Sequence, residues 1–169
     1  MTSDMRKSKH ELAVFREFMA ASGLGIVPDS PSNMEPPFPD IRCSFVDDGI
    51  VYFELGRILD PEMQRLRLAA LRNIGKQVKP DIAKLGLPER DMLRSKLAKG
   101  YRTDGAPIEV LLYFDNDNLL VGDVPVFDDF AWHAEYVMKP EFDLAPPNFR
   151  RVWVFERHRK TILWQYGRT

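Results

Sequence analysis

Apolar residues recur at the spacing of an α-helix in four stretches of the chain. Asp60, as the N-cap, and Pro61, in the first turn, mark the start of the helix predicted at 60–78, and Gly100 marks the end of the helix predicted at 87–100. The pattern therefore predicts amphipathic helices, each with one face available for packing. The predicted helices span residues 9–25, 60–78, 87–100 and 128–139.

Alternation of apolar and polar positions, or a short continuous apolar run, predicts strands in three further segments. These are a hairpin within residues 35–57, a strand at 107–115 and a second hairpin at 150–167. The strand at 107–115 is apolar almost throughout, which is typical of a strand covered on both faces. The order of the elements predicts an α/β (α+β) fold, in which helices flank a single mixed β-sheet that ends in a C-terminal β-hairpin.

Composition narrows the class of protein. With 169 residues, and with no repeat or linker, the chain is expected to form one domain over residues 1–169. A net charge of −1 provides no bulk attraction to nucleic acid or to an anionic membrane. The single cysteine, Cys43, excludes an internal disulfide framework and leaves no cluster for structural zinc. The charged start and the lack of a long apolar run predict a cytoplasmic protein with no membrane partner.

The first hairpin contains two carboxylates, Asp40 and Glu54, within its apolar alternation. A three-residue loop at 47–49, with Gly49 at positive φ, separates the polar face from the apolar face. This register pairs Cys43 with Phe53. It places Asp40 and Glu54 as diagonal neighbours on one face, with Cβ atoms roughly 7 Å apart. Two carboxylates at that spacing can share a hard divalent cation such as Mg²⁺.

A purely structural interpretation also accounts for these carboxylates. In the same register Arg42 lies directly opposite Glu54, so a cross-strand ion pair explains Glu54 without a metal ion. Asp40 follows Pro39 and could simply start the strand. Both interpretations stay open at this point.

The segments FPDI (residues 38–41) and FELGR (53–57) resemble the signature of the PD-(D/E)XK, or restriction-endonuclease-like, nuclease superfamily. The resemblance covers a core of about residues 11–114, followed by the C-terminal helix and hairpin at 127–167. It implies that Asp40 and Glu54 act as catalytic metal ligands for weakly bound Mg²⁺ or Mn²⁺. The upstream helix of this superfamily often adds an acidic residue, and Glu17 is similar to it. The implied activity is metal-dependent hydrolysis of phosphodiester bonds in DNA or RNA.

The chain departs from the signature at the catalytic lysine. Gly56 stands two residues after Glu54, where the superfamily has lysine, and strict alternation sends Arg57 to the other face. The following predicted helix offers Arg65 as a replacement cation and Gln64 as a positioning residue.

The C-terminal hairpin carries a basic tip beside aromatic residues. Arg157, Arg159 and Lys160 are candidates for binding nucleic acid, since aromatic residues next to cations can bind single strands. The alternative is that the aromatic residues pack on a helix while the charges solvate a turn.

Two functions follow from these observations. The first is a Mg²⁺-dependent endonuclease. The second is a catalytically inactive nuclease-like module that binds a protein or nucleic acid, for example an accessory protein of a bacterium or phage. The absent lysine favours the module, and the acidic pair favours the enzyme. A homodimer and a protein partner both stay open.

Overall fold

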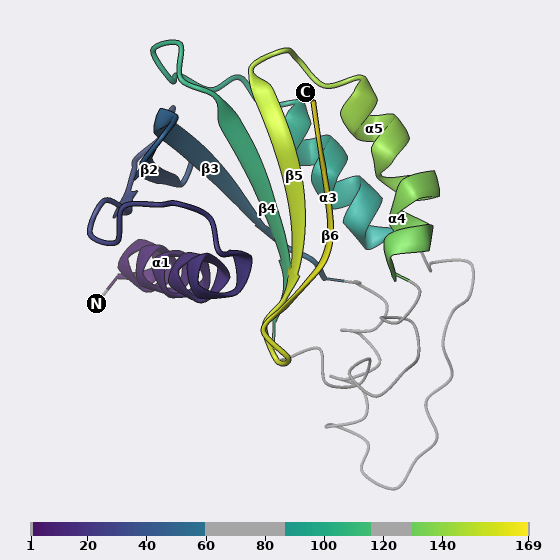
Figure 1. Cartoon of the computed structure of the whole chain (residues 1–169), viewed down its shortest axis with the longest axis horizontal. Coiled ribbons are helices and arrows are strands. Elements are labelled where there is room, and N and C mark those ends of the chain that lie inside the picture. Colours follow the sequence, from purple (N-terminus) through teal and green to yellow (C-terminus); the bar gives the residue numbers. More distant parts are fainter. Residues whose placement is uncertain (1, 60–86, 116–129, 169) are drawn as a thin grey trace, which may run out of the picture.

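The computed structural model describes residues 2–59, 87–115 and 130–168, which form one six-stranded sheet with helices on both faces (Figure 1). The strands lie in the order of the chain, from β1 to β6. The strands are β1 (Ser32–Asn33), β2 (Ile41–Phe45), β3 (Gly49–Arg57), β4 (Ile108–Phe114), β5 (Phe149–Glu156) and β6 (Thr161–Gly167). The helices are α1 (Ser3–Ser22), α3 (Pro88–Leu97), α4 (Phe130–Val137) and α5 (Lys139–Asp143).

The sheet is mixed, as predicted. Strands β2 and β3 form an antiparallel hairpin, β3, β4 and β5 run parallel, and β5 and β6 form the antiparallel C-terminal hairpin. The predicted α/β class and the C-terminal hairpin are thus confirmed. Within the described ranges, no helix combines the length and the apolar character needed to cross a bilayer.

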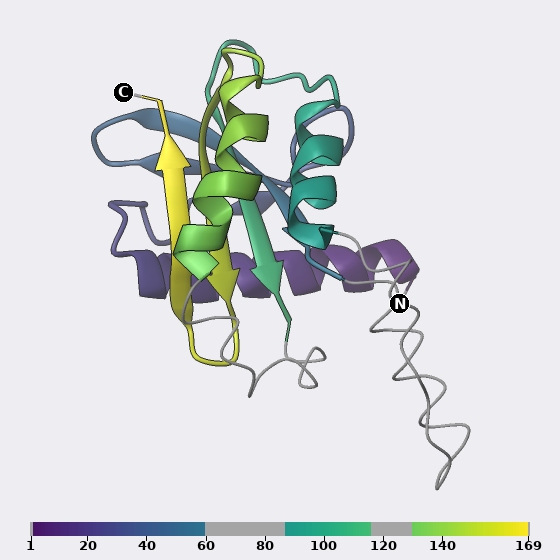
Figure 2. The ribbon, with the colours of Figure 1, turned by 90° about the vertical axis from the view of Figure 1, so that its right-hand side faces the viewer.

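Two hydrophobic cores lie on opposite faces of the sheet. Helix α1 covers one face, where Phe15 and Phe18 pack against Phe53 at ring-centroid distances of 4.8 and 5.9 Å. Helices α3, α4 and α5 cover the other face, as Figure 2 shows. Strand β4 contributes to both cores, and six of its seven residues are buried. This arrangement explains why its sequence is apolar almost throughout.

The predicted elements differ from the structure mainly at their ends. The first helix already begins at Ser3, where the Thr2 hydroxyl accepts a hydrogen bond from the Met5 N–H, and it ends before Gly23 at φ +66°. The helix predicted at 128–139 is α4, and the chain then enters a separate helix, α5, with a proline in its first turn. The helix predicted at 60–78 lies outside the described residues.

The first hairpin differs from its predicted register by two residues. Cys43 pairs with Val51 rather than Phe53, and Gly49, at φ +74°, pairs with Phe45. The loop has the predicted three residues, but they are residues 46–48. A shift of two residues leaves every side chain on its original face, so the separation of polar and apolar faces could not exclude it. Gly49 does adopt the predicted positive φ.

Candidate functional site

Asp40 and Glu54 lie on the face of the β2–β3 hairpin that meets α3. Continuing the observed register one step beyond Ile41, which pairs with Phe53, brings Asp40 opposite Glu54 rather than diagonal to it. The backbone N–H of Leu55 donates to Asp40 Oδ2 over 2.8 Å, which fixes the carboxylate against β3. Glu54 is only 3% exposed. The hairpin therefore brings the two carboxylates together at the edge of the core.

Arg42 does not lie opposite Glu54, as predicted, because the register shift brings it opposite Tyr52. Glu54 is paired instead with Lys96, whose Nζ lies 2.7 Å from Glu54 Oε1. Lys96 comes from the last turn of α3 and is itself largely buried. Lys99, just after that helix, lies 3.7 Å from the same oxygen and is more exposed. An ammonium group thus contacts Glu54 even though the signature position holds glycine.

The packing of α3 explains why Gly56 holds no side chain. A Cβ at this position would lie 2.7 Å from Leu112 Cδ2 and 2.9 Å from Met92 Cγ. Contacts this short require neighbouring side chains in the core to move. Helix α3 therefore occupies the space that a lysine at position 56 would need, and the same helix supplies Lys96.

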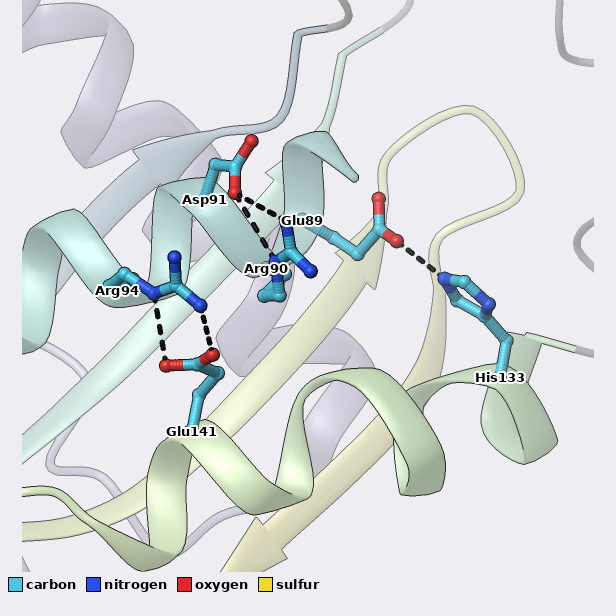
Figure 3. Close-up of polar contacts among 6 residues, drawn as sticks. All are labelled: Glu89, Arg90, Asp91, Arg94, His133 and Glu141. Atoms are coloured by element: carbon cyan, nitrogen blue, oxygen red, sulfur yellow. Dashed lines mark hydrogen bonds and ion pairs between the residues drawn. The ribbon is translucent and has the colours of Figure 1, made fainter. Parts of the chain in front are cut away.

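Side chains from α4 and α5 hold α3 in this position (Figure 3). The Arg94 guanidinium pairs with the Glu141 carboxylate of α5, and the buried Glu89 contacts His133 of α4. Leu93 on the same helix is fully buried. These contacts fix the position from which Lys96 reaches Glu54.

Asp40 and Glu54 line a pocket of about 420 Å³. Its wall on the other side comes from the segment before β2 and from the start of α1. Three lysines, two carboxylates and one tyrosine line it: Lys7, Lys96, Lys99, Asp40, Glu54 and Tyr101. The lysines outnumber the carboxylates, so the pocket can accept an anionic group beside its own acidic pair.

The pKa values of two carboxyl groups near the site, Asp40 and Glu11, are raised. Burial, and then the charge of Glu54, raises the pKa of Asp40. Burial and then the charge of Asp40 raise the pKa of Glu11 on α1 to about 7, against the pull of Lys7, whose Nζ lies 3.4 Å from Glu11 Oε1. Glu11 is thus a third carboxyl group acting on this site.

Sequence reasoning missed both Glu11 and Lys96. Glu11 had a signal, since it lies four and seven residues before Phe15 and Phe18 and is buried on the same side of α1. A charged residue aligned with the apolar stripe of a helix is a candidate for a buried site. Lys96 had no such signal, because only the fold brings α3 to β3.

The acidic residue chosen from the helix, Glu17, is paired elsewhere. Its carboxylate accepts two hydrogen bonds from Arg157, at 2.9 and 2.8 Å, and these lower the pKa of Glu17. Arg157 also contacts Asp115 at 2.8 Å. The structure does not bring Glu17 together with Asp40 and Glu54.

The basic tip of the C-terminal hairpin contains a tight turn. The Glu156 carboxylate accepts hydrogen bonds from the backbone N–H groups of His158 and Arg159, and Lys160 has φ +51°. The neighbouring aromatic residues Trp153, Phe155 and Trp164 are buried in the two cores. Their packing favours the structural interpretation of the aromatic residues, and binding of nucleic acid by the basic residues stays a prediction. The candidates Gln64 and Arg65 lie outside the described residues.

A divalent cation fits the chemistry of the acidic pair. Asp40 and Glu54 offer hard oxygen ligands. Burial is the main cause of the raised pKa of Asp40, and the charge of Glu54 is the second, a repulsion that a cation would relieve. Within the described parts of the chain, no group of three His, Cys, Asp or Glu side chains is close enough to hold a metal ion. Two carboxylates suit Mg²⁺ or Mn²⁺, which retain several waters.

Comparisons of the chain with protein-family models, with curated proteins and with solved structures found no match. The function therefore has to be argued from the site.

Proposed function

We propose that the protein is a metal-dependent nuclease of the PD-(D/E)XK type. One observation carries the proposal: Asp40, Glu54 and Lys96 line one open pocket, although they come from the segment just before β2, from β3 and from α3. Two carboxylates and an ammonium group are the charges that phosphodiester hydrolysis needs. The carboxylates hold the cation, and the ammonium stabilises negative charge on the phosphate.

Each residue has a distinct role in this proposal. Asp40 and Glu54 hold Mg²⁺ or Mn²⁺, and the hydrogen bond from the Leu55 N–H keeps Asp40 oriented. When bound, the cation supplies Lewis-acid activation of water and of the phosphate. Water adds to phosphorus and one P–O ester bond breaks, which leaves a phosphomonoester and a hydroxyl group. Lys96 contacts the phosphate as negative charge develops on it, and so replaces the lysine that the superfamily has at the position of Gly56.

The exposed lysines support a polyanionic substrate. The Lys7 and Lys99 side chains are 69% and 55% exposed at the pocket, where they can attract neighbouring phosphates of a nucleic acid. Attraction by a few local cations is compatible with a net charge of −1, because the opposite charges are distributed elsewhere on the protein.

The second candidate is an inactive nuclease-like module, and the Lys96–Glu54 pair also favours it. Glu54 is nearly fully buried and already neutralised by a close ammonium group. If that pair is permanent, the site holds no metal and the fold serves only to bind a partner.

Labelled single- and double-stranded DNA and RNA, incubated with the protein and Mn²⁺, distinguish the two candidates. If the protein is a nuclease, the wild type is expected to cleave and Glu54→Ala is not. A loss of roughly 10²–10³-fold in rate is also expected for Lys96→Ala. Lys139→Ala is the matched control, because Lys139 pairs with Asp143 at the surface and does not line the pocket.

The proposal of a nuclease would be overturned if no substrate were cleaved and calorimetry detected no Mn²⁺ binding at millimolar concentration. A gel shift with nucleic acid under the same conditions would then identify the binding module. Circular dichroism of each variant shows whether it is folded, so that loss of activity is not confused with loss of structure.

A further inference from the structure

The Tyr101 hydroxyl is a buried polar group without a well-formed hydrogen bond to the described residues. Its Oη is shielded from solvent, and the Glu54 carboxylate, which acts on it as a hydrogen-bond acceptor, does not reach regular hydrogen-bond geometry. Buried hydroxyl groups in proteins nearly always have a partner, so an unpaired one points to an interaction made in another state. Tyr101 lines the pocket beside Asp40 and Glu54.

The backbone around Tyr101 holds the ring in place. Arg102, the next residue, donates its N–H to the Pro37 carbonyl over 3.0 Å, and its guanidinium lies 5.5 Å from the ring centroid of Phe38. The Tyr101 ring packs edge-on against Phe149 at 6.1 Å. The hydroxyl is therefore fixed at the wall of the pocket rather than free to turn into solvent.

Glu54 needs a second donor during the proposed reaction. In the free protein Lys96 occupies Glu54 Oε1 at 2.7 Å. If the Lys96 ammonium turns from this oxygen toward a phosphate, Glu54 becomes a buried carboxylate that has lost its closest donor. Tyr101 lies in the same pocket, where burial, then the charge of Glu54 and the approach of its carboxylate as a hydrogen-bond acceptor, raise the pKa of the Tyr101 hydroxyl.

We infer that Tyr101 is a positioning residue, whose hydroxyl donates a hydrogen bond to the Glu54 carboxylate once Lys96 has moved away. The inference rests on the proposed function. A tyrosine hydroxyl is protonated at neutral pH and can donate. The hydrogen bond orients Glu54 toward the cation, in the way that outer hydrogen bonds orient metal ligands in other proteins.

The test compares Tyr101→Phe with the wild type in three measurements. Thermal unfolding is expected to be unchanged or shifted to higher temperature, because the hydroxyl makes no well-formed hydrogen bond in the free protein. The dissociation constant of Mn²⁺, measured by calorimetry without substrate, is expected to rise at least threefold. The cleavage rate at saturating Mn²⁺ is expected to fall less than the rate at low Mn²⁺.

Tyr52→Phe is the matched control, since Tyr52 is a buried tyrosine two residues before Glu54 on β3. Its Mn²⁺ affinity should equal that of the wild type. A lowered melting temperature of Tyr101→Phe would show that the hydroxyl is structural and would overturn the inference. If the wild type binds Mn²⁺ and Tyr101→Phe binds it with equal affinity, the inference is also overturned, but the proposed nuclease function is not affected. A wild type that binds no Mn²⁺ would refute the nuclease and Tyr101's role together.

Discussion

Lys96 Nζ lies 2.7 Å from Glu54 Oε1, although the two residues are 42 positions apart in the chain. The pair joins α3 to β3 in the wall of the pocket, and both side chains are largely buried. A buried charge that loses its partner is costly, so this contact affects stability as well as the proposed chemistry.

Lys96→Met is expected to lower the free energy of unfolding by about 3 kcal/mol, because it leaves Glu54 buried with only the more distant Lys99. Urea unfolding at pH 8 measures the loss. The double variant Lys96→Met/Glu54→Gln should regain at least half of it, since no buried charge then lacks a partner. Lys99→Met, at a mostly exposed side chain, should cost less than about 1 kcal/mol. If the effects of Lys96→Met and Glu54→Gln, each measured alone, simply added up in the double variant, the two residues would not be energetically coupled.

Asp40→Asn is expected to leave the melting temperature unchanged or to raise it. The amide oxygen can still accept the Leu55 N–H, and the substitution removes the repulsion with Glu54 that contributes to the raised pKa of Asp40. Asp40→Ala removes the acceptor as well and should cost about 1–3 kcal/mol. Differential scanning calorimetry of both variants separates the two effects. A loss of several degrees in Asp40→Asn would show that the negative charge itself stabilises the hairpin.

Gly56→Ala is expected to destabilise the protein by about 1–3 kcal/mol, because the new Cβ would press on Leu112 and Met92 beneath α3. Gly25→Ala is the control, since a Cβ at Gly25 meets no atom within 4 Å. Chemical unfolding of both variants provides the comparison. If Gly56→Ala were as stable as Gly25→Ala, then α3 would not be what excludes a lysine from position 56.

The sequence predicted the sheet and the shared face of the acidic pair because both follow from local periodicity. Alternation along β2 and β3 has a period of two, so any loop with an odd number of residues places Asp40 and Glu54 on one face. The same period hid the two-residue register shift. It therefore could not show that Arg42 lies opposite Tyr52.

The composition of the pocket was not predictable in this way. The contact between Lys96 and Glu54 depends on how α3 packs, and the space at Gly56 depends on Leu112 of a strand far along the chain. Glu11 was predictable in principle, since it aligns with the buried residues of α1. The superfamily resemblance points instead to Glu17, whose carboxylate pairs with Arg157.

Glu11 and Glu17 lie on the same helix and are expected to affect stability in opposite directions as pH changes. Burial, followed by the charge of Asp40, raises the pKa of Glu11 from an ordinary 4.5 to about 7. The folded protein therefore retains a proton that the unfolded chain releases above pH 4.5. Glu11 thus contributes stability that is fully present below pH 4.5 and is lost as pH rises through 7.

Glu11→Gln should accordingly match the wild type near pH 4 and exceed its unfolding free energy at pH 8 by about 2–3 kcal/mol. Glu17→Gln should instead be less stable than the wild type at pH 8, because the hydrogen bonds from Arg157 lower the pKa of Glu17. Its stabilising contribution is present above the ordinary glutamate pKa and disappears as pH falls through the lowered value. Urea unfolding of the two variants and the wild type, from pH 8 down to a pH below the lowered pKa of Glu17, measures both. If the curve of Glu11→Gln ran parallel to that of the wild type, Glu11 would ionise normally and would not belong to the site.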